Sequence, residues 1–227
     1  MFEAGKFDDM LNYCTKILEK NPKDIMALQN SALSLLHLEK FFDCIDICNK
    51  VLNENEFDNY ALTLKIHALE NLGKFNEVLN CCEKLLLKNK EDTWALNSKG
   101  LSLNELNRYS EASEIFNRVL EIDRNNITAL INKALSMSFL GDHQKSIECY
   151  DLAQKINPLM KELSEAKSRE FEKLELKDEA FLAAQGILLE DIEKIKRDAI
   201  KNKCSVFHQF CQMEYQEKIK QSDKPKK

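Results

Sequence analysis

Residues 24–41, DIMALQNSALSLLHLEKF, decide the fold, because the chain repeats their pattern at intervals of 34 residues. The dipeptide Ala27-Leu28 returns three times without a slip. The columns that keep this step are Ala27, Ala61, Ala95 and Ala129; Leu28, Leu62, Leu96 and Leu130; Leu38, Leu72, Leu106 and Leu140; and Leu18, Leu52, Leu86 and Leu120. Such a period is typical of repeat architectures, in which each unit buries its apolar face against its neighbours.

Aromatic residues and turn formers follow the same period. One column contains Phe7, Phe41, Phe75 and Tyr109, and His143 extends it less faithfully. The turn column contains Gly5, Glu39, Gly73, Asn107 and Gly141, and two prolines stand four periods apart at Pro22 and Pro158. Glycine ends a helix by adopting a positive φ, and proline is not tolerated inside a helix. Each unit is therefore expected to consist of a helix, a tight turn, a second helix and a connecting turn.

The composition favours an all-helical chain and argues against several functions. Only 5 Gly and 3 Pro occur among 227 residues, and helix-forming residues dominate. The formal net charge of −5 arises from an acidic region over residues 1–158, which disfavours nucleic acid as a partner. The chain has no signal-like start and no run of about 18 apolar residues, so we expect a cytoplasmic protein that does not associate with membranes.

The eight cysteines are expected to be reduced, because no secretory signal and no C-x-x-C pair accompanies them. Cys14, Cys48 and Cys82 share one repeat column, and Cys81 and Cys149 share another, which indicates core packing. A redox role for the adjacent Cys81 and Cys82 would require exposure and a lowered pKa.

These columns resemble the tetratricopeptide repeat (TPR) family, whose signature combines a large residue, Leu-Gly or Ala, spaced aromatic residues, Ala and a late Pro. The chain departs from that signature by using Leu or Met for the first-helix aromatic residue and Cys at several second-helix aromatic positions. The resemblance implies an all-α, right-handed superhelical solenoid of helix-turn-helix repeats whose first helices line a concave side. The implied parts are a partial unit with the second helix only at 1–24 and full units at 25–58, 59–92, 93–126 and 127–160.

The partial unit leaves a predicted second helix over residues 6–20 without its partner. We therefore expect either that the array is incomplete at this edge or that something covers the apolar face formed by Phe7, Met10, Cys14 and Ile17. The alternative is an atypical natural start, since terminal repeats often deviate.

Beyond residue 160 the period is expected to fail and a C-terminal helical extension to follow. Residues 161–177 are predicted to form a capping helix, and residues 178–220 an amphipathic helical extension with an early break at Gly186. Apolar residues between Leu188 and Met213 recur at helical spacing, which predicts one long helix that seeks a partner. Residues 221–227 are predicted to be a disordered basic tail.

The sequence carries no motif of an enzyme active site. It lacks a Gly-rich phosphate loop, an H-E-x-x-H pair and a nucleophile elbow, so we expect a non-catalytic protein without a cofactor. Cys204, His208 and Cys211 fall at i, i+4 and i+7, which is a candidate metal-ligand set if this segment is one helix. A stable zinc site needs a fourth ligand, and the neighbouring Phe207 and Phe210 favour packing instead.

In the family, positions 2, 5, 9, 12 and 13 of each first helix face the concave surface. The candidate peptide-binding residues at these positions are Gln29, Leu33, His37, Tyr60, Thr63, His67, Trp94, Asn97, Leu101, Asn104, Ile131, Leu135 and Phe139. The remaining residues at these positions are Met26, Leu36, Glu70, Asn71, Glu105, Thr128 and Ser138. Tyr60 and Trp94 are candidate aromatic anchors, although Trp94 could equally serve as core, and Asn97 and Asn104 are candidate partners for a peptide backbone.

The expected partner is another protein. Family members that bind acidic chaperone tails use a clamp of Lys, Asn and Arg, which the matching positions of this chain lack. An apolar groove suits an apolar peptide or amphipathic helix, from another protein, from a second copy or from this chain's own C-terminal helix. We therefore expect a protein–protein interaction scaffold or adaptor. The alternative is a non-catalytic subunit or a fragment of a larger enzyme or assembly.

Overall fold

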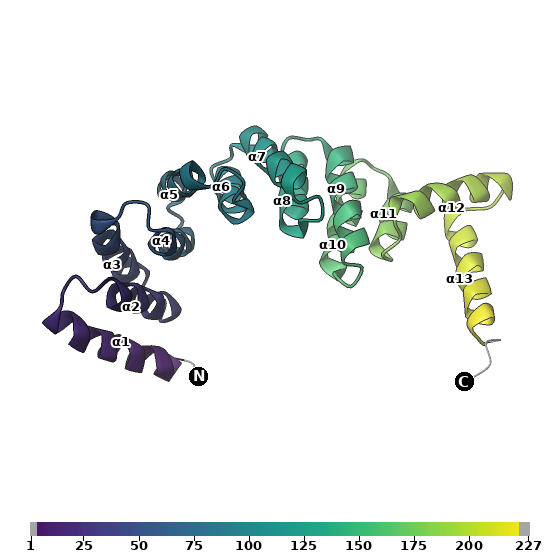
Figure 1. Ribbon diagram of the computed structural model, residues 1–227. Helices are drawn as coiled ribbons and strands as arrows, with labels where there is room; N and C mark the ends of the chain where they lie inside the picture. Colours follow the sequence, from purple (N-terminus) through teal and green to yellow (C-terminus); the bar gives the residue numbers. More distant parts are fainter. Residues whose placement is uncertain (1–3, 223–227) are drawn as a thin grey trace. The chain divides into compact units, whose positions relative to one another are not determined.

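The computed structural model describes the backbone of residues 4–222 and the side chains of residues 5–216. All regular structure in this range is helical (Figure 1). The helices are α1 Ala4–Lys20, α2 Ile25–His37, α3 Phe41–Glu54, α4 Asn59–Asn71, α5 Phe75–Lys88, α6 Thr93–Glu105, α7 Tyr109–Ile122, α8 Ile127–Phe139, α9 His143–Ile156, α10 Lys161–Lys173, α11 Lys177–Ala184, α12 Leu189–Lys201 and α13 Val206–Ser222. The chain divides into two compact units, residues 1–129 and 130–227, and each is described by itself. No helix of the described range is both long and apolar enough to cross a membrane.

The helices repeat with the sequence. The first helices α2, α4, α6 and α8 have 13 residues each, and the second helices α3, α5, α7 and α9 have 14. The tight turns between them place Glu39, Gly73, Asn107 and Gly141 at positive φ, between 57° and 79°. The predicted turn column is thereby confirmed at these four positions. Gly5 is an exception, because it lies inside α1.

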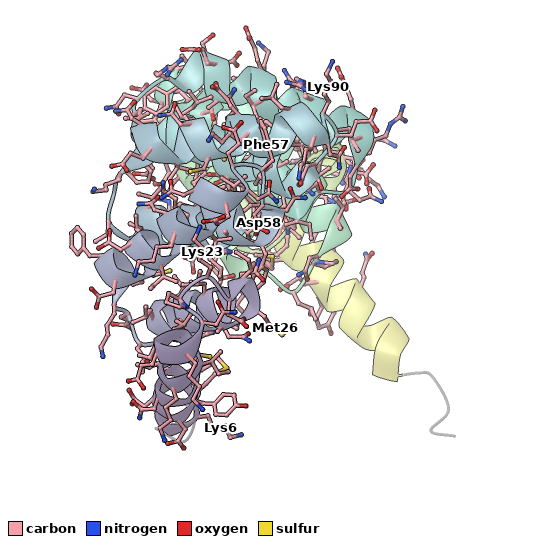
Figure 2. All side chains as sticks on the ribbon, turned by 60° about the vertical axis from the view of Figure 1, so that its left-hand side comes forward. Lys6, Lys23, Met26, Phe57, Asp58 and Lys90 are labelled. Atoms are coloured by element: carbon pink, nitrogen blue, oxygen red, sulfur yellow. The ribbon has the colours of Figure 1, made fainter. Side chains whose placement is uncertain are left out.

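An aspartate or asparagine begins each first helix from α2 to α8. Its side-chain Oδ1 accepts a hydrogen bond from the backbone N–H three residues later, at 2.8 to 3.0 Å. The four pairs are Asp24 with Ala27, Asp58 with Ala61, Asp92 with Ala95, and Asn126 with Ala129. A cap of this kind stabilises a helix by about 1 kcal/mol. In Figure 2, Lys23, Phe57, Asp58 and Lys90 mark successive connecting turns of the first unit.

The first unit's core lies between first and second helices. Leu62, Ile66 and Leu69 of α4 pack with Cys44 and Cys48 of α3, and all five are at most 1% exposed. In the neighbouring core cluster, α6 approaches Phe116 so closely that a Cβ at Gly100 would lie 2.6 Å from the Phe116 ring. The absence of a side chain at Gly100 therefore permits a close contact between the helices.

Six cysteines are buried, namely Cys14, Cys44, Cys48, Cys81, Cys82 and Cys149. Burial raises the pKa of the Cys81 and Cys82 thiols, which disfavours the reactive thiolate. The prediction that the repeat cysteines pack in the core is confirmed, and the redox alternative for Cys81 and Cys82 loses its physical basis.

The predicted open face of α1 is covered by its neighbour in sequence. Helix α1 packs on α2, where Cys14 is 3% exposed and the ring of Phe7 stacks on His37 at 4.1 Å between centroids. Met10 and Ile17 on the same face are half-buried. Within the described residues, α2 therefore covers part of this face, which is one of the two outcomes expected from the partial unit.

The prediction that the period fails at residue 160 is wrong for the backbone. Helix α10 begins 34 residues after α8 and also has 13 residues, and Glu175 adopts φ 61° at the next place in the turn column. Helix α10 is thus followed by a second helix, α11, rather than standing alone as a cap. Helix α11 has only 8 residues, because Gly186 ends the segment at φ 83°.

The single long helix predicted between Leu188 and Met213 is also wrong. The chain forms α12 and α13 instead, separated by a turn in which Lys203 has φ 54°. Ile192 and Ile195 of α12 are 1% exposed and pack with Leu182 of α11 in the second unit's core. The apolar face expected to seek a partner is therefore already covered. Of the predicted basic tail, residues 221 and 222 belong to α13 and residues 223–227 lie outside the described range.

Candidate functional site

The thirteen candidate residues lie on first helices, and none of their side chains is fully buried. Ten belong to the first unit, on α2, α4 and α6. Ile131, Leu135 and Phe139 lie on α8 in the second unit, where Leu135 and Phe139 are 39% and 66% exposed. The first unit therefore contains the larger part of the predicted surface.

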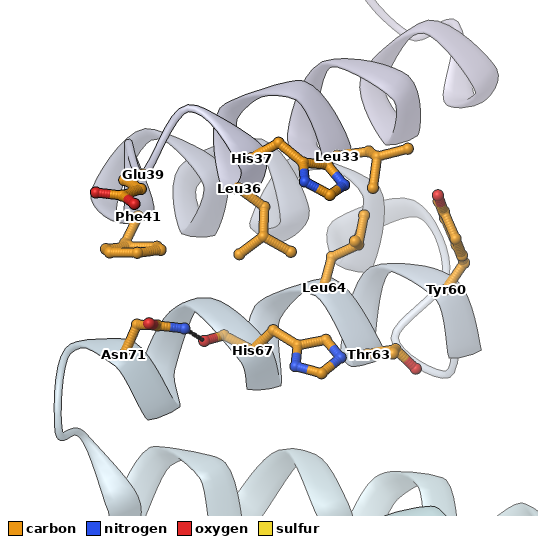
Figure 3. Close-up of a pocket in the computed structure, with 10 residues that line it drawn as sticks. All are labelled: Leu33, Leu36, His37, Glu39, Phe41, Tyr60, Thr63, Leu64, His67 and Asn71. Atoms are coloured by element: carbon orange, nitrogen blue, oxygen red, sulfur yellow. Dashed lines mark hydrogen bonds between the residues drawn. The ribbon is translucent and has the colours of Figure 1, made fainter. Parts of the chain in front are cut away.

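Five of these residues line one open hollow between α2 and α4, which has a volume of about 540 Å³ (Figure 3). Leu33 and His37 come from α2, and Tyr60, Thr63 and His67 come from α4. Leu36 and Asn71, which occupy the family's concave positions, line it as well. The structure thus brings together candidates from two successive repeats.

Three lining residues were not among the predicted positions. Leu64 is 4% exposed and contributes to the apolar part of the hollow, and Glu39 and Phe41 come from the tight turn and the start of α3. The periodic turn and aromatic columns already marked Glu39 and Phe41. Their approach to the hollow depends on how the turn brings α3 back beside α2, which the columns alone do not specify.

Two predicted groove amides bind the residues that cap the following first helices. Nε2 of Gln29 donates to Oδ1 of Asp58 at 3.0 Å, and Nδ2 of Asn97 donates to Oδ1 of Asn126 at 3.3 Å. Asp58 and Asn126 are themselves the caps of α4 and α8. These amide N–H groups therefore connect successive repeats. The Asn97 N–H that bonds Asn126 is not free to bind a peptide backbone, which the sequence did not indicate.

Trp94 packs partly in the core, and its role as an anchor stays a prediction. The indole is half-buried and packs on the core cluster of the first unit, and its ring lies 5.3 Å from the His67 ring. Because His67 also lines the hollow, Trp94 connects the core to the edge of the candidate surface.

Glu70 lies on the same face of α4, next to His67. Its Oε2 is 3.7 Å from Nδ1 of His67, and its side chain is 21% exposed. Its Oε1 is buried and has no hydrogen-bond partner in the described part of the chain. Burial raises the pKa of the Glu70 carboxyl, and the Ser98 hydroxyl and His67 offset this only in part.

The second unit contains a different polar cluster, centred on Glu170 of α10. Its Oε1 accepts hydrogen bonds from Ser138 and Lys173, each at 2.8 Å, and its Oε2 lies 2.8 Å from Nδ1 of His143. Burial acts to raise the pKa of Glu170, but the hydrogen bonds from Lys173, His143 and Ser138 outweigh it and lower the pKa.

The candidate metal-ligand set does not form one helical face. Cys204 lies in the turn before α13, where its Sγ contacts Oε1 of Gln209 at 3.6 Å, whereas His208 and Cys211 lie on α13. His208 is 2.9 Å from Nε2 of Gln212. Within the described residues, no group of three or more His, Cys, Asp or Glu side chains is placed to hold a metal ion.

Comparison with known proteins places these observations in a family. The family model described as "Psidin, N-terminal TPR repeats region" matches residues 1–92, and the model "Tetratricopeptide repeat" matches residues 95–126 and 127–158. Together they cover more than half of the chain. No curated protein matches it at a significant level.

Several solved structures share the fold. A tetratricopeptide repeat protein from Parabacteroides merdae has a TM-score of 0.70 and 20% identity, over 86% of this chain and 75% of that one. A crystal structure of MamA has a TM-score of 0.67 and 18% identity, over 76% of this chain and 94% of MamA. YrrB, described as "a TPR protein with an unusual peptide-binding site", has a TM-score of 0.63 and 16% identity, over 76% of this chain and 89% of YrrB.

At these identities the solved structures support the fold alone, an all-α helical-repeat solenoid. The family models match the same residues that carry the 34-residue columns and the paired helices. The chain belongs to the tetratricopeptide repeat family.

Proposed function

We propose that this chain is a protein–protein interaction scaffold that binds a peptide or helix of another protein on its first-helix surface. Membership of the family supports the broader role, because stacked helix pairs present a continuous row of first helices to a partner. No catalytic step or cofactor forms part of this proposal.

The observation that carries the proposal is the hollow between α2 and α4. Leu33, Leu36 and Leu64 give it apolar walls, while Tyr60 stands at its edge with 44% of its surface exposed (Figure 3). Its volume of about 540 Å³ is in the range of sites that receive several side chains. An amphipathic helix places apolar side chains at i, i+3, i+4 and i+7 into such a trough, and Tyr is a frequent hot-spot residue.

The alternative role, as a non-catalytic subunit of a larger assembly, uses the same surface with a permanent partner. YrrB, a TPR protein with an unusual peptide-binding site, offers a precedent for a fold of this kind. We favour a peptide or helix as the ligand because the hollow is short and spans two successive first helices.

A random peptide library displayed on phage tests the proposal directly. We expect peptides selected on the chain to bind at least about tenfold more weakly to Tyr60→Ala and to Leu33→Ser, because both substitutions remove apolar surface from the hollow. Leu87→Ala is the matched control, since Leu87 is 72% exposed on the second helix α5. Unchanged binding to the two hollow variants, with all variants folded, would refute the proposal.

A further inference from the structure

We propose that the bound segment carries a Lys or Arg side chain that pairs with Glu70, beside the apolar side chains that enter the hollow between α2 and α4. This inference rests on the proposed function and names the chemical class of the partner.

The Glu70 side chain is largely buried in the folded chain, and no Lys or Arg side chain pairs with it within the described residues. Its Oε1 is buried without a hydrogen-bond partner within the described residues. The partners of the carboxyl are the neutral Ser98 hydroxyl and His67, whose Nδ1 is 3.7 Å from Oε2 and which carries charge only when protonated. Burying an acidic oxygen without a partner costs free energy, so proteins normally satisfy such groups. An ammonium or guanidinium group that approaches the exposed part of the Glu70 side chain supplies the opposite charge and a charge-assisted hydrogen bond to the carboxylate.

The lysines of α4 and of the next first helix, α6, pair with other groups than Glu70. Nζ of Lys65 on α4 donates to Oδ1 of Asn49 at 2.7 Å, and Nζ of Lys99 on α6 lies 3.2 Å from Oε1 of Glu83. Asn49 and Glu83 belong to the second helices α3 and α5. These cations therefore point to second helices and stabilise the stacking of one repeat on the next.

The charges of the predicted concave positions have one sign. Among the twenty residues at family positions 2, 5, 9, 12 and 13, Glu70 and Glu105 are acidic, and none is Lys or Arg. Glu39 adds a third acidic group at the edge of the hollow. Complementary charge steers a partner and excludes partners of like charge, so this surface favours a basic segment and rejects an acidic tail.

The surroundings of Glu70 also fit a cation. His67 lies 3.7 Å from the Glu70 carboxyl and 5.3 Å, between ring centroids, from Trp94, so the imidazole links the acid to an aromatic ring. Arg and Lys bind favourably over an indole face. Because His67 also lines the hollow, the basic side chain of the ligand is expected within about one helical turn of an apolar anchor.

Parallel peptide selections on the native chain and on Glu70→Gln test the inference. We expect Lys or Arg next to Leu, Ile or Phe at helical spacing among peptides selected on the native chain, and no basic preference on Glu70→Gln. Glu114→Gln, an exposed acid on the second helix α7, controls for the loss of one negative charge. Trp94 is the only tryptophan, so its fluorescence reports binding at this site.

One selected peptide then enters a double-mutant cycle. Changing its basic residue to Gln, or changing Glu70 to Gln, is expected to weaken binding at least about tenfold, and the two changes together are expected to weaken it no further. If neutral apolar peptides are selected and Glu70→Gln binds them normally while Tyr60→Ala does not, the inference is wrong and the proposed function stands. If no selected peptide is sensitive to Tyr60→Ala or Leu33→Ser, both fail.

Discussion

The two units differ in how they treat carboxylates that are withdrawn from water. In the second unit, Asp151, Glu170 and Glu179 are at most 7% exposed, and each has a lysine within 2.8 Å. In the first unit, Glu70 has His67 at 3.7 Å and one oxygen without a hydrogen-bond partner among the described residues. The pKa of Glu170 is lowered while that of Glu70 is raised. The paired acids hold the fold together, whereas Glu70 is the acid that we propose pairs with a ligand.

The Asp151–Lys167 pair gives the largest expected effect. Nζ of Lys167 is fully buried, 2.7 Å from Oδ1 of Asp151 and 2.9 Å from the carbonyl oxygen of Ile187, and Oδ1 also accepts the backbone N–H of Leu189. Lys167→Ala leaves Asp151 buried with the backbone N–H of Leu189 and with Lys155, which is 3.5 Å away. We expect a loss of about 3–5 kcal/mol in the free energy of unfolding, measured by urea denaturation followed by circular dichroism.

Replacing both partners separates the charge from the packing. The double variant Lys167→Met with Asp151→Leu removes both buried charges, so we expect it to recover most of the lost stability. A double variant as unstable as Lys167→Ala would mean that the hydrogen bonds to Ile187 and Leu189, rather than the ion pair, hold the loop before α12.

Glu170→Gln is expected to cost about 1–3 kcal/mol at pH 7, because it removes a charged acceptor shared by Ser138, His143 and Lys173. The pKa of Glu170 lies below its ordinary value of 4.5 in the folded chain. Its charge therefore stabilises the fold fully above about pH 4.5, and this contribution is lost as the pH falls through the folded-state pKa. Urea denaturation of both proteins from pH 7 to pH 3 measures the difference, and a gap that widens in acid would contradict the assignment.

The periodic part of this molecule could be read from the sequence, because each structural requirement recurs at a fixed step. The sequence does not indicate the repeat after residue 160, because Leu163-Ser164 stands where the Ala-Leu dipeptide is expected, although Leu174 continues the column of Leu140. Lys203 adopts a positive φ in the turn after α12, where the sequence has no glycine to indicate the end of a helix. The fold was thus predictable where a repeat keeps several of the column residues, and it was not predictable where a repeat keeps only one or two of them.

The site was predictable only in outline. Family positions located the hollow's residues on α2 and α4, because a helix presents fixed positions to one side. They did not indicate that Gln29 and Asn97 donate hydrogen bonds to the capping residues of α4 and α8. They also did not indicate that Glu170 binds partners up to 32 residues away in the chain. Such contacts depend on the geometry of side chains from different repeats, which cannot be predicted from the spacing of residues in the sequence.

The smallest expected effect has the opposite sign and tests the comparison most closely. Because the pKa of Glu70 is raised in the folded chain, the folded state binds the proton more tightly than the unfolded state does. The stability of the native chain therefore falls as the pH rises from the ordinary value of 4.5 through the folded-state pKa. Glu70→Gln removes this penalty, so we expect it to be equal to the native chain or up to about 1 kcal/mol more stable at pH 7, and the difference to vanish below pH 4.5.

Fluorescence of Trp94 during urea denaturation measures this difference within the first unit. If Glu70→Gln loses about 1 kcal/mol or more at pH 7 and recovers in acid, as expected for Glu170→Gln, then Glu70 is a structural acid like those of the second unit. If it loses peptide affinity without losing stability, the chain maintains a carboxyl that costs folding free energy and is needed for binding. A residue that weakens the fold yet strengthens recognition is expected at a functional site and not in a core.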